Sequence, residues 1–260
     1  MPASGQPWDP DFLRSSALLS DYSELAESLT SGGDWPTLEA YTRFAEQERR
    51  DRAPELEAVR FAPPRPRRRR ARARAKVEVE VEVEVRELYD GRIALDREVP
   101  CLGASYHDLC NVLVWAAFPR AKRALHERQY RALRGVLTGA PSRLPNRRTR
   151  EQDALTLFDE GGSLLVLPQG GRERIVLFGH ALMEHVSFQT TRINSAALVI
   201  ELPQAAPQGR ALFELLDREL AVRLRDPNQL REPNFERSLA IVSELAERGL
   251  VVSERKPPSA

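Results

Sequence analysis

Apolar residues recur at helical spacing over much of the chain. The helical spacing of apolar residues predicts one helix over residues 9–31 and another at about 37–51. Asp9 and Pro10 are residue types that favour the start of a helix. Residues 105–118 are almost entirely apolar and begin with a capping-box pattern, Ser105 with Asp108 three residues later, so we expect a buried helix there. Further helices are expected at about 119–134, 175–187, 210–225 and 234–248.

A second pattern has period two. The stretch ARARAKVEVEVEVEV, residues 71–85, alternates small or β-branched residues with charged ones and would reach roughly 50 Å if fully extended. We expect only its valine half, residues 77–85, to be a strand, with valines toward the core and glutamates toward solvent, and its arginine half to lead into that strand. Shorter strands are expected at 57–62 and 196–202, a turn at Asp90-Gly91 within 88–99, and a hairpin in which 154–158 and 163–167 flank Asp159-Glu160-Gly161-Gly162.

This mixture of elements predicts an α+β fold, a mainly helical single domain with a small, partly antiparallel β-sheet. Within it we distinguish five parts by composition and pattern: an N-terminal helical part (1–62), a Pro/Arg-rich linker or insertion (63–76), a core α+β domain (77–225), a C-terminal helix with a strand-like end (226–255) and a tail (256–260).

Composition narrows the class of protein. Hydrophobic residues make up 42% and charged residues 30% of the 260 residues, which is ordinary for a globular protein. The longest apolar run, residues 112–118, is far too short to span a bilayer, and the N-terminus lacks a signal-peptide pattern. Cys101 and Cys110 are therefore expected to be buried free thiols. We expect a cytoplasmic protein that does not bind membranes.

The basic charge is concentrated. Residues 60–76 contain eight arginines, one lysine and no acid. A GC-rich genome would produce such an excess of arginine even if these residues had no function. Alternatively, the arginines could have a function in binding phosphate groups, because a guanidinium can bind phosphate through two hydrogen bonds. The second explanation makes the chain a non-enzymatic protein that recognises nucleic acid or another polyanion through residues 65–74 and 143–150. Both of these tracts lack aromatic residues for stacking on single strands. The candidate residues for polyanion binding are Arg67, Arg68, Arg69, Arg70, Arg147, Arg148 and Arg150.

Three polar residues interrupt the apolar helix expected at 105–118. His107, Asp108 and Asn111 fall on one narrow arc of the helix, together with Trp115. Buried polar groups need partners, because an unpaired one costs roughly 1–3 kcal/mol. By contrast, His126 lies on a polar helix face, and we expect it to be solvated.

A second pair of polar residues is spaced for one helix face. His180 and Glu184 are four residues apart, so they stack, whereas His185 points away. The spacing H-x-x-x-E-H matches neither zinc-protease signature, which excludes a zincin.

Together the two helices suggest a divalent metal site. His107, His180 and Glu184 could bind zinc, manganese or iron, with Asp108, Asn111 or Asp159 as catalytic or supporting groups. Such a site could activate water for hydrolysis, for example of a phosphodiester, since arginines are nearby in the sequence. The alternative is a structural polar network in which Asp108 caps its own helix, His107 pairs with Glu184, and Asn111 bonds a loop carbonyl. The spacing does not decide between these two interpretations.

Three sequence blocks resemble a known family. They are YHDLCNVLVWAAFPR (106–120), DALTLFDE (153–160) and FGHALME (178–184), and WPTL (35–38) resembles the family's early helix entry. The resemblance, over about residues 8–220, is to the uncharacterised bacterial family called domain of unknown function three thousand twenty-five. The chain departs from that pattern at Tyr106, where the family has tryptophan. The family has no assigned activity, so the resemblance implies no catalytic residues.

Overall fold

The computed structural model describes residues 7–65, 85–137, 148–188, 193–233, 235, 237–241 and 252–254, with the backbone alone for the last two ranges. The predicted strand at 77–85 and its arginine lead-in lie outside these residues, except for Val85. Val85 is buried and has helical backbone, so the strand does not extend to its expected end.

Helices form in the N-terminal part of the chain, but the single helix predicted over residues 9–31 is wrong before residue 20, because Ser16 has extended backbone. Two 3-10 turns, Phe12–Ser15 and Ala17–Leu19, lead into α1 (Ser20–Thr30), and α2 spans Leu38–Arg52. The Thr37 hydroxyl accepts a hydrogen bond from the backbone N–H of Ala40 and so caps α2. The Ser16 hydroxyl caps the second 3-10 turn in the same way. The apolar faces of these elements supply the first part of the core.

A short parallel ladder joins distant parts of the chain. β1 (Arg60–Ala62) pairs with β2 (Glu98–Pro100), which confirms the strand predicted near 57–62. The turn predicted at Asp90-Gly91 is wrong, because α4 (Tyr89–Gly91) continues into a π-helical turn, Arg92–Asp96. Gly91 permits this close packing, since a Cβ there would lie 2.1 Å from the carbonyl oxygen of Val85.

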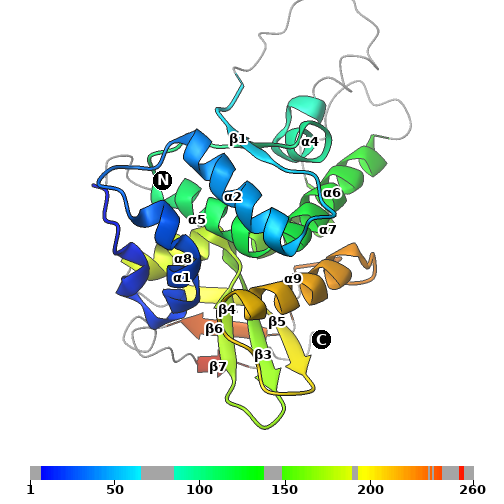
Figure 1. Ribbon diagram of the computed structural model, residues 1–260. Coiled ribbons are helices and arrows are strands. Elements are labelled where there is room, and N and C mark those ends of the chain that lie inside the picture. Colours follow the sequence, from blue (N-terminus) through cyan, green and yellow to red (C-terminus); the bar gives the residue numbers. More distant parts are fainter. Residues whose placement is uncertain are drawn as a thin grey trace, which may run out of the picture.

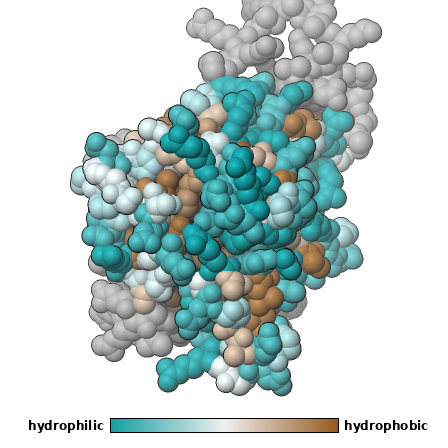
Figure 2. Space-filling view, in the orientation of Figure 1, coloured by the Kyte–Doolittle hydropathy of each residue, from teal (hydrophilic) through white to brown (hydrophobic). Residues whose placement is uncertain are grey.

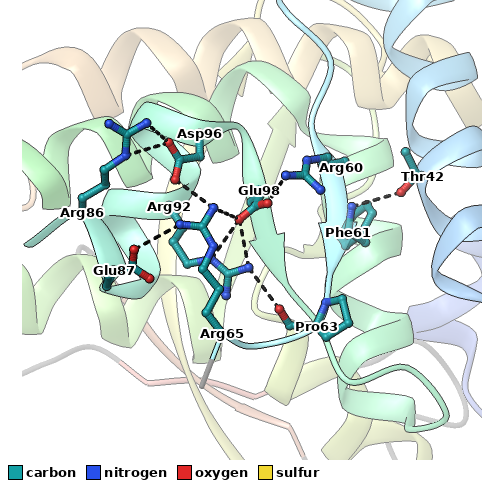
Figure 3. A network of polar contacts seen from close by, with 10 residues as sticks. All are labelled: Thr42, Arg60, Phe61, Pro63, Arg65, Arg86, Glu87, Arg92, Asp96 and Glu98. Carbon is teal, nitrogen blue, oxygen red and sulfur yellow. Dashed lines mark hydrogen bonds and ion pairs between the residues drawn. The ribbon is translucent and has the colours of Figure 1, made fainter. Parts of the chain in front are cut away.

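Ion pairs hold this ladder in place (Figure 3). The buried carboxylate of Glu98 accepts hydrogen bonds from Arg60, Arg65 and Arg92, the last at 3.0 Å. Arg65 also reaches Asp96 at 3.0 Å, where it meets Arg86. Through Arg65 and Arg86 the network joins the two described segments that flank residues 66–84.

Two long helices form the centre of the molecule. α5 (Tyr106–Ala117) is capped by Ser105, whose hydroxyl accepts from the backbone N–H of Asp108, and α6 (Pro119–Val136) begins at Pro119. Both match the prediction, and ten of the twelve residues of α5 are buried.

The hairpin predicted around residues 159–162 is wrong. Residues 150–161 form α7 (Arg150–Gly161), because Thr149 and Gln152 make a complete capping box at its start. β3 (Gly162–Pro168) follows without a turn. A Cβ at Gly162 would lie 2.3 Å from the carbonyl oxygen of Phe158, so the chain can pass directly from helix to strand only at a glycine.

The remaining elements build a five-stranded sheet. β4 (Arg174–Leu177) precedes α8 (His180–Phe188), so the helix predicted from residue 175 starts later than expected. β5 (Ile193–Leu202) and α9 (Gly209–Arg225) match their predictions. The helix predicted at 234–248 is wrong over residues 237–241, which form β6 (Arg237–Ile241) and pair with β5 and with β7 (Val252–Glu254).

The sheet order is β4-β3-β5-β6-β7, with β3 and β5 parallel and the other pairs antiparallel. In Figure 1 this sheet occupies the lower part of the molecule and the helices lie above it. The fold is therefore α+β and mainly helical, as predicted. The surface in Figure 2 is mostly hydrophilic, with scattered hydrophobic patches. Every helix in the described part of the chain is too short or too polar to cross a membrane.

α6 depends on a cap supplied by another helix. The buried carboxylate of Asp217, on α9, accepts hydrogen bonds from the backbone N–H groups of Arg120 (3.2 Å) and Ala121 (2.8 Å). These N–H groups belong to the first turn of α6 and have no partner inside the helix. Asp217 thus fixes the start of α6 against α9.

Replacing Asp217 with alanine should lower the free energy of unfolding by about 2–3 kcal/mol, because two buried N–H groups lose their charged acceptor. Urea unfolding followed by circular dichroism measures this loss. Glu214→Ala on the same helix is the control, since it removes only an exposed pair with Arg218 and should cost less than about 0.5 kcal/mol. An equal loss of unfolding free energy in the two variants would contradict the role of Asp217 as a cap of α6.

Candidate functional site

The predicted histidines come together where α5 packs against α8. The rings of His107 and His180 are 4.6 Å apart between centroids and meet edge to face. His107 is one of the few polar residues of α5, and His180 is the first residue of α8. The contact between these two apolar helices therefore places both imidazoles at one point.

Glu184 supports His107 from one turn along α8. Its Oε2 lies 3.3 Å from Nδ1 of His107, and this hydrogen bond, more than any other influence, raises the pKa of His107. The pairing is the one expected in the structural network. It also resembles the way in which carboxylates orient metal-binding histidines.

Glu160 is a member of the site that sequence reasoning missed. Among the described residues, His107, Glu160 and His180 form a group whose potential ligand atoms all lie within 4.8 Å of one another. The misassigned hairpin concealed this residue, because it placed Glu160 in a solvated turn. On the last turn of α7, Glu160 instead faces the histidines, and Glu184 stands behind His107.

His180 is held in one tautomer. Its Nδ1 lies 2.9 Å from the backbone carbonyl oxygen of Asp159, which can only accept, so Nδ1 carries the proton. Burial lowers the pKa of His180 to about 3, so the ring is neutral and Nε2 carries a lone pair. That lone pair is 3.4 Å from Oε2 of Glu160. Two acceptors face each other, which requires a proton or a cation between them.

A buried ion pair lies directly behind the histidines. Nζ of Lys122, a fully buried residue of α6, donates to Oδ1 of Asp159 at 2.5 Å. Burial opposes ionisation of Asp159, but the positive charge of Lys122 is the main influence that holds its pKa far below the usual range. The same residue therefore binds Lys122 with its carboxylate and His180 with its carbonyl.

His126 extends this polar cluster and is not solvated, contrary to expectation. It is 1% exposed, its Nδ1 contacts Asp90 at 2.9 Å, and its ring stacks on Trp115. The wheel for α6 placed His126 on a polar face correctly, but that face packs against α4 and α7. The neighbours, and not the helix itself, determine its burial.

The other predicted catalytic residues have structural partners. The Asp108 carboxylate accepts from the backbone N–H groups of Leu102 (2.9 Å) and Gly103 (3.0 Å), so it fixes the loop before α5. The amide of Asn111 donates to the Tyr89 hydroxyl at 3.1 Å and not to a loop carbonyl. Neither side chain belongs to the group of His107, Glu160 and His180.

The predicted polyanion-binding residues are only partly described. Arg67, Arg68, Arg69, Arg70 and Arg147 lie outside the described residues. Arg148 and Arg150 are exposed, and Arg150 pairs with Glu232 at 3.2 Å. Burial raises the pKa of Glu160, and the positive charges of His107, Lys122 and Arg148 oppose this shift.

Removing one partner of the Lys122–Asp159 ion pair should destabilise the folded protein. Lys122→Met leaves the Asp159 carboxylate buried without its cation, and we expect the free energy of unfolding to fall by about 3–5 kcal/mol. In the double variant Lys122→Met/Asp159→Leu no charge is left unpaired, so stability should return toward that of the wild type. Denaturant unfolding of the three proteins gives the comparison. A double variant less stable than Lys122→Met would contradict this account.

The neutral state of His180 should make stability depend on pH. The folded-state pKa lies below the unfolded value near 6.5, so the unfolded chain takes up the proton first. Stability from this residue is complete above about pH 6.5 and is lost as the pH falls toward 3. Relative to His180→Gln, the wild type should lose about 1.4 kcal/mol per pH unit in that window, measured by unfolding with chelator present. A pH-independent difference would contradict a neutral, buried His180.

Comparison with known proteins identifies a matching family but no activity. No curated protein and no solved structure matches the chain significantly. A family match covers residues 77–171, which include His107, Lys122, Asp159 and Glu160. It confirms the family inferred from the sequence and contains the blocks at 106–120 and 153–160, whereas residues 35–38 and the block at 178–184 lie outside the match. Over residues 77–171 the chain is a match to the family described as protein of unknown function (DUF3025).

Proposed function

We propose that His107, Glu160 and His180 bind a divalent cation, and that the protein is a metal-dependent hydrolase. The observation that carries this proposal is the lone pair of His180 Nε2 facing the Glu160 carboxylate at 3.4 Å. A cation between the two would turn an unfavourable contact into two metal–ligand bonds. Two imidazoles and one carboxylate suit zinc, manganese or iron.

The groups behind the ligands support the same proposal. Metal-binding histidines usually donate their second N–H to a carbonyl or a carboxylate, which fixes the ring orientation. His180 donates to the carbonyl of Asp159, and His107 contacts the carboxylate of Glu184. With Nδ1 of His107 on Glu184, Nε2 is the nitrogen that would face the cation. The sequence grouped Glu184 with the ligands, and we now assign it this supporting role.

The site has one side accessible to solvent. The side chains of Glu160 and His107 are 46% and 35% exposed, whereas His180 is 4% exposed. Three protein ligands leave a coordination position for water, whose pKa a bound cation lowers toward neutrality. A substrate could therefore reach the cation from the side of Glu160 and His107.

Arg148 indicates the charge of that substrate. It is exposed and close enough to Glu160 to affect its pKa. A positive charge that acts on a ligand of the site favours an anionic substrate, and a phosphoester is the class we propose. Arg65, by contrast, is engaged by Glu87, Asp96 and Glu98, so it does not favour the alternative of a non-enzymatic polyanion-binding protein. The free thiols of Cys101 and Cys110 support placing this activity in the cytoplasm.

The wild-type protein should bind one zinc or manganese ion per chain after loading and dialysis. His180→Ala should weaken this binding by about 100-fold, because it removes a buried ligand, and His107→Ala should have a similar effect. Isothermal titration and elemental analysis measure the stoichiometry and the affinity.

His185→Ala is the matched control, since His185 lies on the same helix but is exposed and outside the site. It should bind metal as the wild type does. Equal metal content in His180→Ala and His185→Ala would refute the site. Metal binding without metal-dependent hydrolysis of a phosphodiester such as bis(p-nitrophenyl) phosphate would refute the hydrolase and retain the metal centre.

A further inference from the structure

A small cavity lies between α2, α5, α6 and residues 56–59. Its volume is about 10 Å³, close to the minimum for a single water-sized occupant. Arg49 of α2, Trp115 of α5 and Arg123 of α6 line it, together with Leu56 and Glu57. None of the proposed metal ligands lines this cavity, so it is a separate feature.

Three buried N–H donors around this cavity have no partner in the protein. They are Nε of Arg49, Nε of Arg123 and Nε1 of Trp115. Arg123 is 5% exposed and Trp115 is 3% exposed, so solvent outside the molecule does not satisfy them. An unsatisfied buried donor costs about 1–3 kcal/mol, and three around one cavity indicate a bound acceptor.

The charges around the cavity are not fully balanced. The guanidinium of Arg49 donates to the carbonyl oxygens of Pro54 (3.4 Å) and Leu56 (2.8 Å), which carry no formal charge. Arg123 donates to the carbonyl oxygen of Glu57 at 2.8 Å, and its NH1 is 3.9 Å from the Glu127 carboxylate.

The Glu57 carboxylate, which could neutralise these cations, is instead 2.7 Å from Nε of Arg97. The pKa of Arg123 is lowered by burial and then by the positive charge of Arg97. The carboxylates of Glu127 and Glu57 act on Arg123 in the opposite direction. Two arginines, Arg49 and Arg123, and one acid, Glu57, therefore line the cavity, so positive charge is in excess there.

We infer that this cavity binds one monatomic anion of the chloride class. An anion can accept all three N–H donors at once, whereas a water molecule must also find acceptors for its own two hydrogens. The small volume favours a single-atom ion over phosphate, sulfate or a carboxylate ligand. Because the donors come from three helices, the anion would fasten α2 to α5 and α6.

Crystals grown with sodium bromide test this directly. We expect an anomalous peak inside the cavity, in contact with Arg49, Arg123 and Trp115. A cavity that holds only water, or nothing, in those crystals would overturn the inference.

Thermal unfolding provides a second test. At constant ionic strength, replacing gluconate by chloride should raise Tm in a saturable manner, because the anion binds only the folded chain. Trp115→Phe keeps the ring but removes one donor and should weaken chloride binding about tenfold, and Arg49→Lys, which keeps the charge, should do so too. Arg43→Gln, an exposed change on α2, should leave the chloride response intact. Chloride stabilisation that is equal in all four proteins would contradict the site.

Discussion

The buried ion pair between Lys122 and Asp159 is the interaction on which the site depends. A fully buried lysine is stable only if its charge is compensated, so α6 and α7 must keep one relative position. The Lys122 ammonium also lies 5.5 Å from the centroid of the Trp115 ring, which connects the pair to α5. Three helices thus meet around one charge, and the start of α6 is fixed separately by Asp217 on α9.

The ion pair also determines the state of His180. Once Lys122 fixes the Asp159 side chain, the backbone of the last turn of α7 is fixed as well. Its carbonyl oxygen then accepts the Nδ1 proton of His180, and the next residue, Glu160, faces Nε2. A structural charge pair therefore orients a lone pair toward a carboxylate, which is the geometry that the metal proposal uses. Glu184 does the same for His107 from the other side.

Much of the fold could be predicted from the sequence, because local signals agree with the tertiary structure in α2, α5, α6 and α9. The sequence-based predictions were wrong where tertiary contacts determine the secondary structure. The Gly161-Gly162 pair has the composition of a hairpin turn, but the cap at Thr149 and the packing of Phe158 make it a helix end. The sequence brought His107, His180 and Glu184 together correctly as neighbours. It could not find Glu160 or Lys122, since Glu160 was placed in the wrong element and a lysine on a helix normally points to solvent.

The central claim is that the ion pair holds a neutral His180 with its proton on Nδ1. Nitrogen-15 chemical shifts of the histidine side chains, recorded on metal-free protein near neutral pH, test this most directly, because they distinguish both tautomers from the imidazolium. We expect a protonated Nδ1 and an unprotonated Nε2 for His180, and a loss of this preference in Lys122→Met. An Nε2-protonated or doubly protonated His180 in the wild type would contradict it.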